Sequence, residues 1–164
     1  MRIGVKSMAT AAEHIAQANH NQDVLDRMLV DPSPFWDWIA IVAFYKAVHS
    51  VEAVIFENEK PPHKHSASHK NRGALLKMKY PDMWRNYWPL LKASKVARYL
   101  EYEEKGITHG VVRFSDYMPG TVVVAYLLNH DFVQFEKAAA ASLSDPSALK
   151  RFSMPANTKP GGPV

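Results

Sequence analysis

The stretch from residue 34 to residue 57 constrains the fold most, because it is apolar on nearly every face of a helix. Such a helix must be surrounded by other elements or lie in a membrane. A membrane span needs about 18 or more nearly charge-free apolar residues, and this stretch contains Asp37, Lys46, His49 and Glu52. The sequence therefore predicts the central helix of a bundle.

Further helices are predicted on both sides of this segment from capping residues and helical spacing. Thr10-Ala-Ala-Glu13 has the spacing of a capping box, and the helix that it opens should end before Asp31-Pro-Ser-Pro34. Ser66 or Ser68 is expected to cap a third helix. Pro81 suits the first turn of a fourth helix, which would run to about residue 102 and be kinked or split at Pro89.

The remaining chain predicts one long helix over about 119–142 and a short one over 145–152, followed by a flexible tail rich in proline and glycine over 155–164. The beginning of the long helix, Val122-Val-Val124, favours strand by propensity. No element is predicted for 103–118, although Val111-Val-Arg-Phe114 could be extended.

Together these patterns predict an all-α protein, an up-and-down antiparallel bundle of four to five helices over 8–142 with a short helix and tail over 143–164. A chain of 164 residues suits one domain. The absence of cysteine excludes disulfides and zinc–thiolate sites. No secretory signal or membrane span is expected, so a cytoplasmic location is predicted. The predicted core includes Phe44, Val48, Val51, Leu91 and Leu127.

Four sequence motifs occur in a fixed order between residues 8 and 102. The central helix reads W…FYxAxHxVEA from Trp38 to Ala53, the third helix begins with SHxxR from Ser68 to Arg72, and the fourth carries Y…S..ARY from Tyr87 to Tyr99. The first helix fits AxxN…L from Ala18 to Leu29. In these motifs the chain resembles the HEPN superfamily of small helical-bundle proteins, in particular its short, stand-alone members.

The resemblance implies a helical bundle, a homodimer, and a link to nucleotides or RNA. Many members of the superfamily are RNases of toxin or defence systems that use an arginine followed by a histidine after four to six residues. No arginine of this chain has a histidine at that distance. Because that pair supplies the proton-transfer group and the cation on the phosphate, we expect a binding protein rather than an enzyme.

The candidate site joins polar residues of the three helical motifs. A neutral histidine moves a proton near pH 7, so His49 and His69 are the catalytic candidates. Guanidinium groups make bidentate contacts with phosphate, which predicts a phosphate site made of Arg72, Ser94, Arg98, Tyr99, His49 and His69. The alternative, which the sequence favours, is a structural network in which Arg98 pairs with Glu52 and His49 satisfies Ser94 or a carbonyl.

A metal site is the weaker interpretation of the histidines that follow the central helix. His63, His65 and His69 could supply imidazole ligands, with Glu57 or Glu59 as a carboxylate. Because prolines break this loop, a solvated basic segment is favoured over a metal site, and no cofactor is predicted. The tryptophans and tyrosines at helical spacing are likewise expected in the core or on a dimer surface rather than as platforms for bases.

The function predicted from sequence is therefore a non-catalytic HEPN-like protein that binds a nucleotide or an RNA phosphate, as a homodimer and without a membrane. The net charge of +4 tolerates a polyanionic partner without demanding one. One alternative is an RNase or nucleotide-acting toxin-type enzyme with a rearranged His/Arg site. A second is an interaction subunit of a toxin–antitoxin or defence pair, with a nucleotidyltransferase-type partner.

Overall fold

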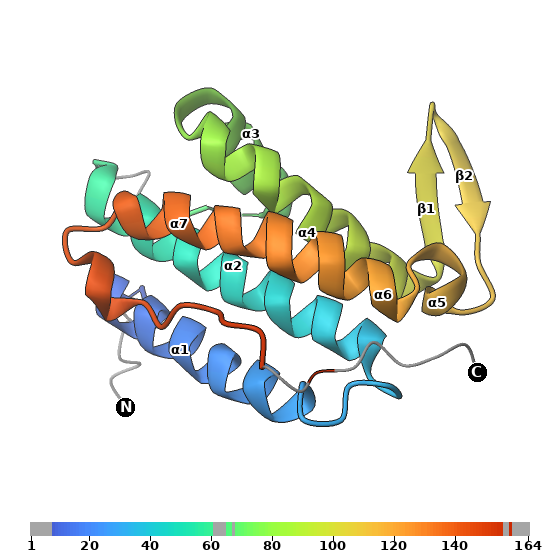
Figure 1. The fold of residues 1–164 in the computed structure, drawn as a ribbon. Helices are drawn as coiled ribbons and strands as arrows, with labels where there is room; N and C mark the ends of the chain where they lie inside the picture. Colours follow the sequence, from blue (N-terminus) through green and yellow to red (C-terminus); the bar gives the residue numbers. More distant parts are fainter. Residues whose placement is uncertain (1–7, 61–64, 67, 156–157, 159–164) are drawn as a thin grey trace, which may run out of the picture.

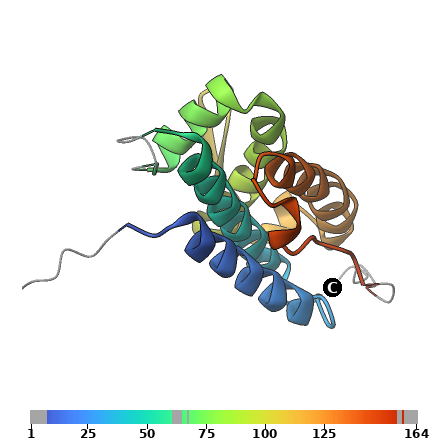
Figure 2. The same ribbon diagram turned by 90° about the vertical axis from the view of Figure 1, so that its left-hand side faces the viewer.

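The computed structural model describes residues 8–60, 65–66, 68–155 and 158. It is a helical bundle in which α2 (Trp36–Asn58) lies at the centre, with α1 (Ala11–Met28) on one side and α4 (Pro81–Tyr99) and α7 (Val133–Ala141) on others (Figures 1 and 2). The predicted all-α fold is confirmed. The small exception is a two-stranded hairpin that projects from the bundle beyond α4 (Figure 1).

The first helix begins and ends as its sequence predicts. The hydroxyl of Thr10 accepts the Glu13 N–H at 3.3 Å, and the Glu13 carboxylate accepts the Thr10 N–H at 2.7 Å, which completes the capping box. The helix ends at Met28, before the proline-containing connection. This connection turns the chain back, so that α1 packs along α2 and the beginning of α1 lies beside the second half of α2.

Helix α2 is the core helix that its composition indicates. By length and hydropathy alone it could cross a membrane, but 72% of its most apolar stretch is buried inside the bundle. The five residues predicted for the core, on three different helices, are all buried: Phe44, Val48, Val51, Leu91 and Leu127. The hydrophobic effect of burying this helix against its neighbours is what holds the bundle together.

A buried ion pair joins α2 to the C-terminal part of the chain. The ammonium group of Lys46 contacts the carboxylate of Glu136 on α7, and it also donates a hydrogen bond of 2.7 Å to the carbonyl oxygen of Lys150. Burial lowers the pKa of Lys46 and raises that of Glu136. Because Leu149 and Phe152 are buried against the bundle, the segment after α7 contributes to the same core.

The third and fourth helices follow one another with a single residue between them. Ser68 caps α3 (His69–Lys79) by accepting the Asn71 N–H at 3.1 Å. Helix α4 continues through Pro89 as one helix, so of the predicted kink or split, the split does not occur. It ends at Tyr99 rather than near residue 102, because Leu100 takes a left-handed conformation with φ of 55°.

Strands β1 (Glu101–Glu104) and β2 (Ile107–Gly110) form an antiparallel hairpin for which the sequence analysis predicted no element. Glu104 pairs with Ile107, which leaves a loop of two residues, Lys105 and Gly106, with φ of 52° and 79°. Positive φ at both loop residues matches the twist of the flanking strands. A short helix, α5 (Phe114–Tyr117), packs beside the hairpin (Figure 1).

The predicted C-terminal helix is confirmed, including its beginning at the valines. It consists of α6 (Gly120–Val122), the π-helical segment η1 (Val123–Phe132) and α7. Its first residue must be small, since a Cβ atom on Gly120 would lie 2.3 Å from the indole nitrogen of Trp36. The short helix predicted over 145–152 is wrong except for one 3₁₀ turn, η2 (Pro146–Ala148). Most of the predicted tail lies outside the described residues.

Candidate functional site

The polar residues singled out from the sequence lie in two adjoining groups beside α2. The first, here called the Glu52 network, consists of His14, His49, Glu52, His65, Ser66 and Arg72. The second, the Arg98 patch, consists of Tyr45, His69, Lys95, Arg98 and Tyr99. The ring of Phe44 packs against the second group, with its centroid 5.5 Å from the His69 ring and 5.9 Å from the Arg98 guanidinium carbon, and the contact of His69 with Arg72 joins the two groups. The structure therefore brings the motifs of α2, α3 and α4 to neighbouring positions.

Glu52 is the centre of the first group. Its side chain is 6% exposed. Arg72 of α3 donates a hydrogen bond from Nε to its Oε1 at 2.9 Å, and Nη2 of the same guanidinium lies 2.8 Å from Oε1 in an ion pair. Ser66 donates to the same carboxylate from its hydroxyl and from its backbone N–H, the latter to Oε2 at 3.1 Å. Burial raises the pKa of Glu52, but these hydrogen bonds and the charge of Arg72 outweigh it, so the pKa lies below its ordinary value.

His14 and His49 form a pair across the interface between α1 and α2. Their Nδ1 atoms lie 3.1 Å apart, a hydrogen bond that requires one ring to donate and the other to accept. Burial lowers the pKa of both imidazoles, and nearby Arg72 lowers both further. The two rings are therefore neutral near pH 7, the form in which imidazole acts as a base or as a metal ligand.

His65, in the connection between α2 and α3, lies beside both Glu52 and His14. Its Nδ1 lies 3.6 Å from Oε2 of Glu52, and its ring centroid lies 5.5 Å from that of His14. The Nε2 atoms of both His14 and His65 are buried, and within the described part of the chain they have no hydrogen-bond partner.

His69 links the two groups. Its Nδ1 lies 2.8 Å from Nη1 of Arg72, while its ring faces Phe44. Partial burial lowers the pKa of His69, and the positive charges of Arg72, Arg98 and Lys95 lower it further. Among these cations, Arg72 is balanced by Glu52, whereas Arg98 and Lys95 form no ion pair among the described residues.

In the described part of the chain, Arg98 is held by neutral groups only. Its Nε donates to the Ser94 carbonyl at 3.0 Å, Nη2 reaches the Ser94 hydroxyl at 3.4 Å, and Nη1 reaches the Tyr45 hydroxyl at 3.4 Å. The guanidinium carbon lies 5.9 Å from the centroid of the Tyr45 ring and 5.2 Å from that of Tyr99, within the range of cation–π attraction. Both tyrosines are exposed, so the patch faces solvent.

The pairings expected in the structural network are wrong. Arg72, not Arg98, pairs with Glu52. Arg98 lies beside Phe44, which precedes Glu52 by about 12 Å along the helix axis. His49 contacts His14 rather than Ser94, whose hydroxyl donates to the Leu91 carbonyl at 3.0 Å.

The set of metal ligands expected from sequence does not form as a unit. His65 and His69 would lie one turn apart only if the third helix began early, but α3 begins at His69. The two rings therefore turn to different partners, His65 to Glu52 and His69 to Arg72. His63 lies outside the described residues.

The site also contains His14, Ser66, Tyr45 and Lys95, which were not among the predicted site residues. Tyr45 belongs to the motif of the central helix, but the sequence analysis expected it in the core or on a dimer surface. The other three belong to no local pattern that signals chemistry. His14 meets His49 across 35 positions of sequence, and Ser66 was considered only as a helix cap. These residues are brought into the site by the packing of the helices and not by their spacing in the sequence.

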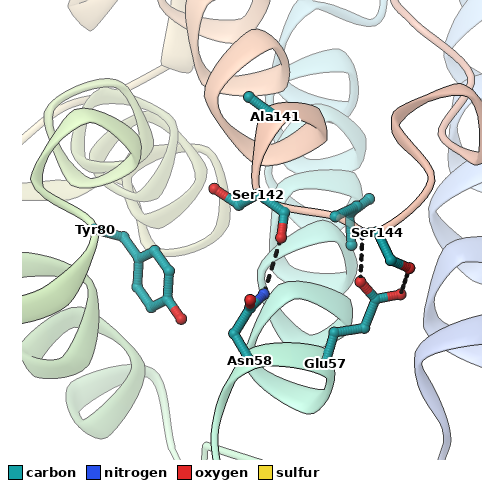
Figure 3. Close-up of a pocket in the computed structure, with 7 residues that line it drawn as sticks. Glu57, Asn58, Tyr80, Ala141, Ser142 and Ser144 are labelled. Atoms are coloured by element: carbon teal, nitrogen blue, oxygen red, sulfur yellow. Dashed lines mark hydrogen bonds between the residues drawn. The ribbon is translucent and has the colours of Figure 1, made fainter.

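A separate pocket lies where the end of α2 meets the end of α7 (Figure 3). Its polar groups bind one another: the Asn58 amide donates to the Ser142 carbonyl at 2.9 Å, and Ser144 donates to Glu57 from its N–H at 2.7 Å and its hydroxyl at 3.1 Å. These contacts fasten α7 to α2. Of the residues that the sequence analysis named for a site, the pocket contains only Glu57, a candidate carboxylate of the predicted metal site.

Comparison of the chain with models of known protein families, with curated proteins and with solved structures gives no match.

Proposed function

We propose that this protein is a non-catalytic, cytoplasmic, HEPN-like binding protein that holds a phosphate group of a nucleotide or of RNA at the Arg98 patch. The observation that carries this proposal is the state of Arg98. Its guanidinium lies between two exposed tyrosines and, among the described residues, has no carboxylate partner. A guanidinium in this state is available for the two parallel hydrogen bonds that a phosphate accepts.

The electrostatics of the patch support the same ligand. Arg98 and Lys95 both lie close enough to His69 to lower its pKa, and neither charge is balanced by an acid within the described residues. His69 is the first residue of α3, where the helix dipole adds partial positive charge. A phosphate bound there would be attracted to Arg98 and Lys95 and would raise the pKa of His69.

The aromatic residues favour a nucleotide over inorganic phosphate. The side chains of Tyr45 and Tyr99 are 37% and 62% exposed and flank the guanidinium. Exposed rings beside a cation are the arrangement on which bases stack, with a gain of about 1–3 kcal/mol for each base.

The groove next to the patch limits how a polyanion can lie. It is formed by α4 and the hairpin, and Lys95 and Tyr99 on its α4 side face Glu101, Glu103 and Glu104 on the other. The acidic side repels phosphate. A strand of RNA would therefore run from the patch toward α3 rather than along the hairpin.

Fluorescence anisotropy with a labelled single-stranded RNA, and calorimetry with ATP, test the proposal. We expect salt-dependent binding, and Arg98→Ala should weaken it about 10-fold or more because a charge-assisted hydrogen-bond pair is lost. The affinity of Arg98→Lys should lie between those of the wild type and Arg98→Ala, since lysine keeps the charge but lacks the planar guanidinium. The matched control is Arg85→Ala, on the same helix but paired with Asp82 at the surface.

Equal affinity of wild type and Arg98→Ala, or no binding of RNA or ATP at low salt, would show the proposal to be wrong. The two ligand sources are separated by competition. If ATP displaces the RNA at one ATP per chain, the patch is a nucleotide site, whereas binding of RNA alone identifies a longer single strand as the ligand.

One observation favours an RNA-cleaving or nucleotide-acting enzyme as the second candidate. The imidazole of His69 contacts Arg72, and His49 belongs to the buried Glu52 network. The pKa values of both imidazoles are lowered. A neutral imidazole beside a cation is suited to general base catalysis.

We further infer that the protein forms a homodimer through the first half of α2. Phe35 and Trp38 lie three positions apart and are 43% and 57% exposed. Aromatic residues of this kind are enriched at protein interfaces. A second copy of the chain that covered Phe35 and Trp38 would remove these side chains from water and would leave Tyr45 exposed in the Arg98 patch.

A further inference from the structure

The Glu52 network contains three groups that the phosphate proposal does not use: the imidazoles of His14 and His65 and the carboxylate of Glu52. One donor atom from each lies within 4.8 Å of the other two. They come from α1, from α2 and from the connection that precedes α3, so the fold itself assembles them. We infer that His14, Glu52 and His65 bind a divalent transition-metal ion of the zinc class.

The first support is the state of the two imidazoles. Nε2 of His14 and Nε2 of His65 are both buried, and neither has a hydrogen-bond partner among the residues that the structure describes. Buried polar atoms in folded proteins nearly always have a partner, and leaving one unsatisfied costs about 1–3 kcal/mol. Two such nitrogens on neighbouring rings, 5.5 Å apart between centroids, indicate a shared ligand.

The hydrogen bond between His14 and His49 leaves His14 ready to bind a metal. When Nδ1–H of His14 donates to Nδ1 of His49 at 3.1 Å, the proton is on Nδ1 and the lone pair of Nε2 is free. Imidazoles that bind metals commonly hold their other N–H in a hydrogen bond of this kind, which fixes the tautomer and the ring orientation. His49 is thus a positioning residue for His14.

Glu52 is held in a fixed orientation that leaves one oxygen for the ion. Arg72 binds Oε1. Among the described residues, Oε2 accepts one hydrogen bond, from the Ser66 N–H at 3.1 Å, and it lies 3.6 Å from Nδ1 of His65. The charge of Arg72 offsets the pull of the carboxylate on any cation. The two imidazoles must therefore supply most of the affinity, which favours Zn²⁺, Co²⁺ or Ni²⁺ over Mg²⁺ and Ca²⁺.

The geometry fits after a small closure. Zinc lies about 2.0–2.2 Å from nitrogen and oxygen ligands, so tetrahedral ligand atoms are roughly 3.3 Å apart. From the present limit of 4.8 Å, the three side chains would close by up to about 1.5 Å. His65 lies outside the helices and makes this adjustment without moving the bundle. Two histidines and one glutamate leave the fourth position of the ion open.

Calorimetric titration of the chelator-treated, tag-free protein with ZnCl₂ tests the inference. We expect one ion per chain and a loss of at least about 10-fold in affinity for His14→Gln and for His65→Gln, since each removes one of three ligands. The matched controls are His20→Gln, an exposed histidine on the same helix as His14, and His69→Gln. Both should bind zinc as the wild type does. The absorption bands of tetrahedral Co²⁺ should appear in the wild type and be lost in His14→Gln.

The inference is wrong if His14→Gln and His65→Gln keep wild-type affinity, if no zinc binds, or if affinity depends on His69 but not on His14. In the last case the ion is held at the beginning of α3 and not by α1. Should His14→Gln fail to fold by circular dichroism, His65→Gln, which lies outside the helices, decides the matter. Arg98→Ala should keep its zinc affinity and His65→Gln its RNA affinity, so this inference and the phosphate proposal fail separately.

Discussion

Arg72 on α3 and Glu52 on α2 form a buried ion pair, in which Nε and Nη2 lie 2.9 and 2.8 Å from one carboxylate oxygen. Their side chains are only 9% and 6% exposed. The pair attaches the beginning of α3 to the central helix. It also positions two histidines: Glu52 lies beside His65 of the Glu52 network, and Arg72 contacts His69 of the Arg98 patch.

Removing Arg72 should therefore destabilise the whole bundle. Arg72→Ala leaves the Glu52 carboxylate buried with only Ser66 and His65 as partners, and breaking a buried pair in this way costs about 3–5 kcal/mol. Urea unfolding followed by circular dichroism measures the loss. Arg85→Ala, which breaks an exposed pair on α4, should leave the free energy of unfolding unchanged. Equal stability of both variants would mean that the pair does not hold α3.

Stability should fall when the pH is lowered through the range in which histidine titrates. Burial lowers the pKa of His14 and His49 below the ordinary 6.5. Between the folded and unfolded values the unfolded chain binds more protons, so the free energy of unfolding decreases with falling pH. The pKa of Glu52 is also lowered in the folded protein. Below the ordinary value of 4.5 the unfolded chain therefore again binds more protons, and the free energy of unfolding decreases further with falling pH.

Urea unfolding at about pH 7.5 and about pH 5.5 measures this dependence. His14→Gln and His49→Gln should each reduce the difference between the two conditions, because glutamine does not titrate. His20→Gln should keep the full difference. A wild type equally stable at both values would contradict the predicted burial of neutral imidazoles.

Local signals of the sequence were enough for the helices but not for the pairings between them. The Thr10–Glu13 box and the apolar α2 are determined by neighbours in sequence, and both are where they were predicted. The hairpin was missed because its signal is two residues, Lys105 and Gly106, in a short and otherwise charged segment. Glycine after a charged residue in a tight turn is a weak local pattern.

The candidate site was predictable only as a set of residues. His49, His69, Arg72 and Arg98 all lie near one another, but the sequence could not say which arginine meets Glu52. Both arginines lie on helices that pack near α2, and the choice depends on how the connection after α2 places α3. His14 entered the site only because α1 packs antiparallel to α2, which brings its first turn beside His49.

Trp38→Asp should convert the proposed homodimer into a monomer. The substitution places a charge on the exposed aromatic face of α2, where burial in an interface would be costly. Sedimentation velocity measures the mass, and an unchanged circular dichroism spectrum shows that the fold is kept. Tyr126→Asp, on an exposed residue of η1, is the control and should remain dimeric. A monomeric wild type at micromolar concentration would refute the interface.

The purified protein should not cleave RNA in the presence of a chelator. No arginine of the chain is followed by a histidine at the spacing that the RNases of the HEPN superfamily use. Labelled RNA incubated with the protein and EDTA, and separated on a gel, should stay intact. Cleavage that is lost in His49→Ala or His69→Ala would make the enzyme, our second candidate, the better account.

The location of the bound ligand tests the central proposal most directly. Amide chemical shifts of isotopically labelled protein, recorded during titration with a short single-stranded RNA, report which residues the ligand contacts. We predict that the largest changes occur at Tyr45, His69 and residues 95–99, and that they disappear in Arg98→Ala. Changes confined to the pocket between Asn58 and Ser144, or unaltered changes in the variant, would contradict a phosphate site at Arg98.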